Sequence, residues 1–275
     1  MAMAQQSARQ AVPAPGRTHH RDADRGKRWV QPIAPILTVI LLCALWEVTA
    51  VSGLSPAFIL PQPLDVLRRL IEAMGDGTIP TNAAATLQEA ALGFALAALV
   101  AFPLGYWLAH APLIERFFAP AIAASQAVPA VAVAPLLLLW LGNGILPKVA
   151  VCAVIVVFPL LVSTVTGIRS VAKEYLEVAH VFGAPWWEQV LRVEVPLAAP
   201  VLLSGIKLGI TLALTGAVVG EFVASDQGLG YLLTFARQNF DTPLLYATLL
   251  VLAAIGIALY SFISFLERIV AQWQG

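Results

Sequence analysis

Charged side chains are scarce in this chain, because Asp, Glu, Lys and Arg make up 12% of its 275 residues, against about 25% in soluble domains. Hydrophobic residues account for 59%, and several apolar runs approach the ~20 residues that span a bilayer. A soluble globular domain is therefore excluded, and an all-α integral membrane protein is expected. The formal net charge is zero, which gives no sign of a nucleic-acid partner.

Cysteines and catalytic patterns are also scarce. The two cysteines, Cys43 and Cys152, lie inside apolar runs and are interpreted as small core residues, with no support for a disulfide or a metal site. The chain has no G-x-x-x-x-G-K-S/T loop, so it cannot cradle nucleotide phosphates by that route. It also lacks paired carboxylates, a His/Cys cluster and a Ser/His/Asp arrangement, and His110 and His180 are isolated. An enzyme is therefore not expected.

The first residues, 1–28, are polar and contain almost no large apolar side chain, which predicts a disordered cytoplasmic tail. No convincing cleavage site follows the first apolar run, so this run is expected to remain as a membrane helix. The rest of the chain, 29–275, is assigned to one transmembrane domain.

Six membrane spans are predicted from the apolar runs, and prolines interrupt two of them. Pro129 and Pro135 fall in the third span, and Pro147 and Pro159 fall in the fourth. Broken or re-entrant pieces are expected there, either covered by protein or lining a water-filled cavity. The predicted spans are 33–52, 84–109, 117–141, 146–168, 200–222 and 243–266.

The distribution of Lys and Arg sets the expected orientation. With the N-terminus inside, eleven of the 16 Lys and Arg residues fall on the cytoplasmic side, and Lys207 lies within the fifth span. Because cytoplasmic loops carry the excess of basic residues, both termini and residues 169–196 are predicted to be cytoplasmic. The four residues predicted outside are Arg68, Arg69, Lys148 and Arg237.

Two segments predicted outside the membrane carry local motifs. After a Leu-Pro-Gln-Pro element, residues 64–74 repeat Leu, Ile and Met at helical spacing, which predicts a short amphipathic helix on the outer membrane surface. After the fifth span, Gly228 and Gly230 mark a tight turn, and residues 231–235 are expected to form a short interfacial helix.

The most informative segment lies between the fourth and fifth spans. Residues 175–182 form a predicted helix more apolar than a solvated loop, Gly183 is placed to end it with a positive φ, and Pro185 suits the first turn of a second helix. An apolar helix pair left outside the membrane needs a protein partner. The residues that recur at fixed spacing are Glu177, Ala179, Gly183, Val193, Val195 and Pro196.

This spacing resembles the cytoplasmic "EAA" loop of ABC importer permeases, with Val178 in place of the usual first Ala. The Leu-Pro-x-Pro element and the Gly-x-Gly-aromatic turn resemble permeases of the nitrate/sulfonate/taurine type, and the resemblance covers residues 55–270. It implies a type I ABC importer (MetI-like) permease fold with about six transmembrane helices, in a bacterial inner membrane.

The resemblance also implies partners. They are a second permease copy, giving a homodimer, an ATPase subunit that binds ATP-Mg, an extracytoplasmic substrate-binding protein, and membrane lipids; this chain itself is expected to bind no cofactor. Within the loop at 169–196, Glu177 either contacts a basic residue of the ATPase or pairs with Lys173 four residues earlier. The residues expected to couple to the ATPase are Glu177, Val178, Ala179, Phe182, Gly183 and Pro185.

Ionisable side chains at membrane depth are costly and are functional candidates. Glu47 is interpreted as reaching the outer interface, and Lys207 as extending to the cytoplasmic face. Glu221, at the end of the fifth span, either lines the translocation pathway or holds the glycine turn that follows. Gln126, in the broken third span, is a second candidate for the pathway.

The predicted function is therefore the membrane-spanning permease subunit of an ABC importer. The resemblance implies a small solute such as a sulfonate, taurine, nitrate or a thiamine-type pyrimidine precursor. An alternative is a secondary transporter driven by an ion gradient, which is expected to show inverted repeats and membrane-buried acidic groups. A membrane enzyme is a third class, disfavoured because no catalytic cluster is present.

Overall fold

A computed structural model of the chain describes residues 37–272, apart from 39, 53–55, 57 and 224. The predicted tail at 1–28 lies outside the described residues. The chain divides into two units, residues 1–54 and 55–275, which are described separately. The described part of the first unit contains an apolar helix, Ile40–Val51, within the first predicted span.

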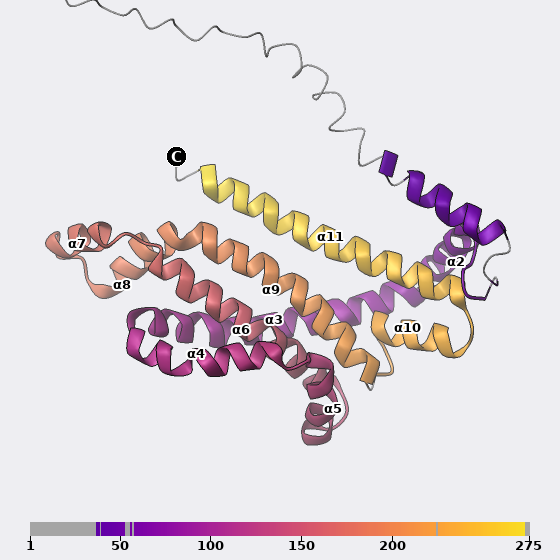
Figure 1. Cartoon of the computed structure of the whole chain (residues 1–275), viewed down its shortest axis with the longest axis horizontal. Helices are drawn as coiled ribbons and strands as arrows, with labels where there is room; N and C mark the ends of the chain where they lie inside the picture. Colours follow the sequence, from indigo (N-terminus) through magenta and orange to yellow (C-terminus); the bar gives the residue numbers. More distant parts are fainter. Residues whose placement is uncertain (1–36, 39, 53–55, 57, 224, 273–275) are drawn as a thin grey trace, which may run out of the picture. The chain divides into compact units, whose positions relative to one another are not determined.

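Four helical segments of the second unit have the length and composition to cross a membrane. They correspond to the second, fourth, fifth and sixth predicted spans, and each extends beyond its predicted bounds. Their main helices are α3 (Thr78–His110), α6 (Ile145–Arg169), α9 (Val195–Val223) and α11 (Thr242–Gln272), coloured in chain order in Figure 1. The third segment begins before α9, at Trp186.

The third predicted span is not one helix, and this corrects its predicted bounds. It consists of α4 (Pro112–Ala127) and α5 (Ala130–Leu141), separated by Val128 and Pro129. A residue before proline is pushed out of the helical region, and Val128 accordingly has φ −78° and ψ 121°. The expected break is therefore found at this point, and it divides the span into two pieces each too short to cross a bilayer.

The fourth predicted span is continuous, so the break expected at its prolines was wrong there. Pro147 lies in the first turn of α6, where backbone N–H groups have no acceptor within the helix, so its missing N–H costs no hydrogen bond. Pro159 lies inside the helix, which continues through it to Arg169. A proline in the interior of a membrane helix is tolerated where neighbouring helices compensate for the lost backbone bond.

The core of the second unit is formed by α3, α6 and α9, which approach closely through small residues. A Cβ placed on Gly93 of α3 would lie 2.1 Å from the Cβ of Cys152, and one on Gly216 of α9 would lie 2.8 Å from its Cα. Cys152 is fully buried, as expected of a small core residue, whereas Cys43 is exposed, so the same interpretation was wrong for Cys43. Membrane helices associate through such close packing, because lipid provides little hydrophobic driving force.

The short helices α2 (Pro63–Gly75) and α10 (Leu229–Gln238) lie together at one end of this unit (Figure 1). In α2, Val66 and Ala73 are buried while Leu64, Leu67, Ile71 and Met74 are exposed, which agrees with an amphipathic helix on a membrane surface. The α10 helix is longer than predicted and packs into a small core with α2, α3 and α11, so it is not merely interfacial.

An ion pair ties α2 to the start of α11. The Nε of Arg69 donates to Oδ2 of Asp241 at 3.0 Å, and its Nη2 lies 2.9 Å from the same oxygen. This hydrogen bond raises the pKa of the Arg69 guanidinium above its ordinary value. The sequence placed Arg69 outside the membrane, and its partner Asp241 lies two residues before the last predicted span.

Candidate functional site

The loop between α6 and α9 forms two short helices at the end of the unit away from α2 and α10 (Figure 1). They are α7 (Lys173–Val181) and α8 (Trp186–Gln189), and α8 continues into α9 through the π-helix η1 (Val190–Glu194). Gly183 follows α7 with φ +71°, as predicted. The N–H of Ala184 donates to the carbonyl of Ala179 at 3.0 Å, which satisfies the end of α7.

The surface of this loop is apolar and exposed. No residue of α7 or α8 is buried, and Phe182, Val181 and Trp186 are 85%, 83% and 75% exposed. Glu177 is exposed on the same short helix, and among the described residues no ion pair joins it to Lys173. The predicted coupling residues therefore share one short segment that makes few contacts with the rest of its own chain.

The first stem of the loop is attached to the corner between α3 and α4. Arg169, the last residue of α6, places its Nη1 2.6 Å from Oε2 of Glu115. Its Nε and Nη2 donate to the carbonyls of Ala109 and Leu108, each at 3.1 Å. A cation that satisfies the last carbonyls of a helix also stabilises the negative end of the helix dipole.

The second stem is attached to the same corner. Glu194, the last residue of η1, is 3% exposed, and its Oε1 lies 2.9 Å from Nε2 of His110 at the end of α3. The expectation that His110 is isolated was therefore wrong. Both ends of the loop therefore contact the α3–α4 corner.

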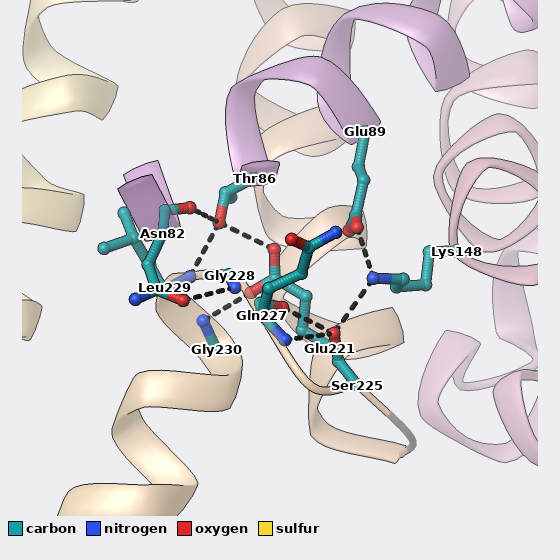
Figure 2. A network of polar contacts seen from close by, with 10 residues as sticks. All are labelled: Asn82, Thr86, Glu89, Lys148, Glu221, Ser225, Gln227, Gly228, Leu229 and Gly230. Carbon is teal, nitrogen blue, oxygen red and sulfur yellow. Dashed lines mark hydrogen bonds and ion pairs between the residues drawn. The ribbon is translucent and has the colours of Figure 1, made fainter. Parts of the chain in front are cut away.

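At the other end of the unit, polar side chains are buried in a network that Figure 2 shows from close by. The Thr86 hydroxyl donates to Oε1 of Glu221 at 2.6 Å and accepts from the N–H of Leu229 at 2.8 Å. The N–H of Gly230 donates to the other oxygen, Oε2, of Glu221. These contacts join α3, the end of α9 and the start of α10, and they favour the predicted role of Glu221 in holding the turn.

The same network contains a buried ion pair. The Nζ of Lys148 lies against Oε1 of Glu89 and donates to Oγ of Ser225 at 2.9 Å (Figure 2). Lys148 is 4% exposed and Glu89 is 1% exposed. Lys148 was predicted to be one of the basic residues outside the membrane, whereas it lies buried in the first turns of α6. We call Thr86, Glu89, Lys148 and Glu221 the outer polar cluster, after the side of the membrane on which the sequence predicts this end to lie.

The glycine turn is shaped by the Glu221 carboxyl group. A Cβ on Gly228 would lie 2.2 Å from Cδ of Glu221, and one on Gly230 would lie 2.8 Å from its Oε2. Gly228 also has φ +111°, a conformation that L-residues with side chains rarely adopt. The two glycines predicted to mark a turn are thus required by the approach of a buried carboxyl group.

The remaining membrane candidates are dispersed. Lys207 pairs with Glu267 of α11 at 2.5 Å, and Gln126 lies in α4 with its side chain outside the described part of the structure. Glu89 was missed by sequence reasoning, although an acidic residue inside the second predicted span was itself a signal. Glu194 was missed because nothing in its local pattern indicates burial.

An apolar hollow of about 590 Å³ lies beside the break between α4 and α5, half-way along α6 and α9. Of the described residues that line it, only Ser125 has a polar side chain and none is charged. The irregular backbone at Val128 and Pro129 borders this hollow, as expected of a break at membrane depth. The side chains that line it include Ser125, Val128, Val133, Ile155, Phe158 and Leu212.

Known proteins resemble this chain in sequence and in fold. Residues 101–274 match the family described as binding-protein-dependent transport system inner membrane component. The riboflavin transport system permease protein RibX of Chloroflexus aurantiacus is 46% identical, over 86% of this chain and 89% of that protein. The formylaminopyrimidine transport permease protein ThiX of Halalkalibacterium halodurans is 32% identical, over 90% and 98% of the two chains.

A solved structure of the MetNI methionine ABC transporter, in an inward-facing conformation, has a similar fold. The TM-score is 0.60 at 15% sequence identity, and the match covers 68% of this chain and 93% of that one. At this identity the likeness concerns the fold alone. It agrees with the type I importer fold that the family resemblance implied.

Proposed function

The chain belongs to the family of binding-protein-dependent transport system inner membrane components and is the permease subunit of an ABC importer, and we propose that its solute is a neutral, flat heterocycle of the flavin or aminopyrimidine kind. It is a multi-pass integral membrane protein, consistent with the inner membrane. The observation that carries the proposal is the apolar lining of the hollow at mid-membrane depth.

The physical argument concerns desolvation. Nitrate and alkanesulfonates carry a full negative charge, and zwitterionic taurine carries an ionised sulfonate beside its ammonium group. Moving such charged groups into an apolar site is costly unless cations or several donors receive them. Arg and Lys side chains are the usual partners for such oxyanions, and no described residue of the hollow is charged. A neutral ring system instead gains from contact with side chains such as Phe158 and Ile155.

The relatives support the same class of solute. The RibX protein, 46% identical over most of this chain, is named for riboflavin, and the ThiX protein for a formylaminopyrimidine. Both compounds contain flat nitrogen heterocycles. Sulfonate, taurine and nitrate, which the sequence resemblance implied, are the competing solutes.

The proposal is tested by uptake into proteoliposomes that contain the permease, its ATPase and its binding protein. We expect ATP-dependent uptake of riboflavin or of the formylaminopyrimidine, and none of taurine. Phe158→Ala, in the hollow, should lower uptake several-fold, whereas Phe262→Ala, 59% exposed on α11, should leave it unchanged. Uptake of taurine alone, or equal loss in both variants, would contradict the proposal.

The loop at 169–196 is proposed to dock on the ATPase subunit, which binds ATP-Mg. The exposed apolar side chains of α7 and α8 support this, because an apolar surface outside the membrane is commonly covered by a partner. The contact is assigned to Glu177, Val178, Ala179, Phe182, Gly183 and Pro185. The attachment of both stems to the α3–α4 corner provides a direct mechanical connection to the membrane helices.

The rest of the assembly is proposed from the family. A second copy of this chain, giving a homodimer, and an extracytoplasmic substrate-binding protein complete the importer. No relative named above is an ion-gradient-driven transporter, and that alternative gains no support.

The orientation, with both termini in the cytoplasm, is tested by labelling with a membrane-impermeant thiol reagent. A cysteine introduced as Asp76→Cys, in the exposed turn after α2, should react from outside in a Cys43→Ser background. The background substitution is needed because Cys43 is itself exposed. Reaction from the cytoplasmic side alone would reverse the assignment.

A further inference from the structure

The outer polar cluster contains more negative than positive charge. Glu89 and Glu221 supply two carboxyl groups and Lys148 one ammonium group, and all three residues are at most 4% exposed. If both carboxyl groups were ionised, the cluster would carry one uncompensated negative charge in a nearly dry interior. Such a charge is costly, and two nearby carboxylates relieve it when one of them takes a proton.

The hydrogen bonds of the two carboxyl groups differ. Both oxygens of Glu221 accept a bond, one from the Thr86 hydroxyl and one from the Gly230 N–H. Glu89 receives Lys148 on Oε1, while its Oε2 is buried and has no partner. The Glu89 and Glu221 carboxyl groups belong to the same buried network and are close enough to interact electrostatically, and both are acceptors only when ionised (Figure 2).

We propose that the outer polar cluster is a proton-binding site, in which Glu89 and Glu221 share one proton and so form a neutral cluster with Lys148. The shared proton supplies the missing partner of Glu89 Oε2 and removes the excess negative charge. The ligand is a proton; a bound metal cation is the competing solution to the same charge imbalance.

The neighbouring charged and titratable groups do not replace this proton. Asp226, exposed in the turn before α10, adds further negative charge, and Cys152 of α6 is buried near both carboxyl groups and supplies no positive charge. Lys148 is thus the one cation among the described residues that face the two carboxyl groups. Glu89, Lys148 and Glu221 lie on α3, α6 and α9, and Gly230 lies in the first turn of α10. The shared proton therefore stabilises the packing of these four helices. This inference does not depend on the identity of the solute.

Infrared spectroscopy of the purified importer in lipid nanodiscs tests the proposal directly. At neutral pH in sodium-free buffer we expect a band from a protonated carboxyl group, which disappears in both Glu89→Gln and Glu221→Gln. In Lys148→Met the cluster loses its cation, so a second proton should bind and the band should become about twofold stronger. Glu72→Gln, on the exposed face of α2, is the matched control and should keep the wild-type band.

A second measurement is the pH dependence of thermal unfolding. The folded chain holds a proton that a glutamate in the unfolded chain has already lost at neutral pH. The free energy of unfolding should therefore decrease as pH rises. For one proton, the unfolding equilibrium constant should increase by up to tenfold per pH unit. Either Gln variant should remove this part of the slope, whereas Glu72→Gln should retain it. The wild-type spectrum remains informative if a variant does not fold.

Three results would overturn the proposal. The first is a wild-type spectrum without a protonated carboxyl band at neutral pH, and the second is a band unchanged in both Gln variants. The third is a band that disappears when sodium or potassium is added. The last result would identify a metal cation as the ligand of the cluster.

Discussion

The two ends of the helical unit both depart from the usual distribution of side chains, one by burying charged groups and the other by exposing apolar groups. At the outer polar cluster, charged groups such as Glu89 and Lys148 are buried. At the loop between α6 and α9, large apolar groups such as Phe182 and Trp186 are exposed. Buried charge requires partners within the same chain, whereas exposed apolar surface indicates a partner that the chain does not itself provide.

This difference indicates which contacts stabilise each end. The outer end is closed by contacts between α3, α6, α9 and α10, so substitutions there should act on folding. The loop is attached to its own chain chiefly at its stems, through Arg169 and Glu194. Substitutions between those stems should act on assembly with the ATPase and leave folding intact.

The largest effect is expected at Gly228, where the outer end is most crowded. Gly228→Val places a β-branched side chain at φ +111° and against the Glu221 carboxyl group, and we expect a loss of about 3–5 kcal/mol in the free energy of unfolding. Gly77→Val is the matched control, because Gly77 has φ +84° but open space around it. Thermal unfolding of both variants separates crowding from backbone strain, and equal losses would show that crowding is unimportant.

The next effect concerns Glu177 in the loop. If Glu177 contacts a basic residue of the ATPase, Glu177→Ala should weaken ATPase binding by ~2–5 kcal/mol, with expression and membrane insertion unchanged. If it is only an exposed partner of Lys173, the loss should be about 0.3–0.5 kcal/mol. Binding affinities of Glu177→Ala and Lys173→Ala distinguish the two roles, and equal small losses would remove Glu177 from the docking surface.

A smaller effect is expected at Gly183, which has φ +71° and open space around it. Gly183→Val should cost ~1–2 kcal/mol of local backbone strain and misplace α8, without changing the membrane helices. Ala172→Val is the control, since Ala172 has φ −66° and is exposed. Co-purification with the ATPase should decrease for Gly183→Val alone; undiminished complex formation and uptake would count against the docking role of the loop.

The smallest effect is expected at the ion pair between α2 and α11. Arg69 and Asp241 are about 32% and 28% exposed, so solvent screens their attraction. Arg69→Met should lower the free energy of unfolding by about 1 kcal/mol or less, and high salt should reduce the wild-type advantage. A loss as large as that of Gly228→Val would mean that the outer end depends on this pair and not on the buried cluster.

Much of the fold was predictable because its signals are local. Apolar runs identified the regions of the long helices, and Pro129 placed the break between α4 and α5. Gly183 predicted a helix end with positive φ. The continuity of α6 through Pro159 was not predictable, because it depends on which neighbouring helices pack against it. The boundaries of α10 were missed for the same reason.

The candidate site was predictable only in part. The helix at 173–181 and the positive φ of Gly183 were predicted from patterns within one segment, whereas the docking role of the loop stays a prediction. The burial of Lys148 and the pairing of His110 with Glu194 were missed, because each contact joins helices far apart in the sequence. A local pattern cannot distinguish a lysine at the membrane surface from one paired below it.

By itself, then, the sequence determined that the chain is an all-α membrane protein, that residues 169–196 form a helix pair with the spacing of a coupling loop, and that the chain has no G-x-x-x-x-G-K-S/T loop for nucleotide phosphates. These properties follow from composition and short-range spacing, since hydrophobic burial and turn geometry act on neighbouring residues. Only the tertiary structure decided which charges are buried and which groups surround them. Burying a charge removes its hydration, so its free energy depends on every group around it. For Glu89, Lys148 and Glu221, these groups come from α3, α6, α9 and α10.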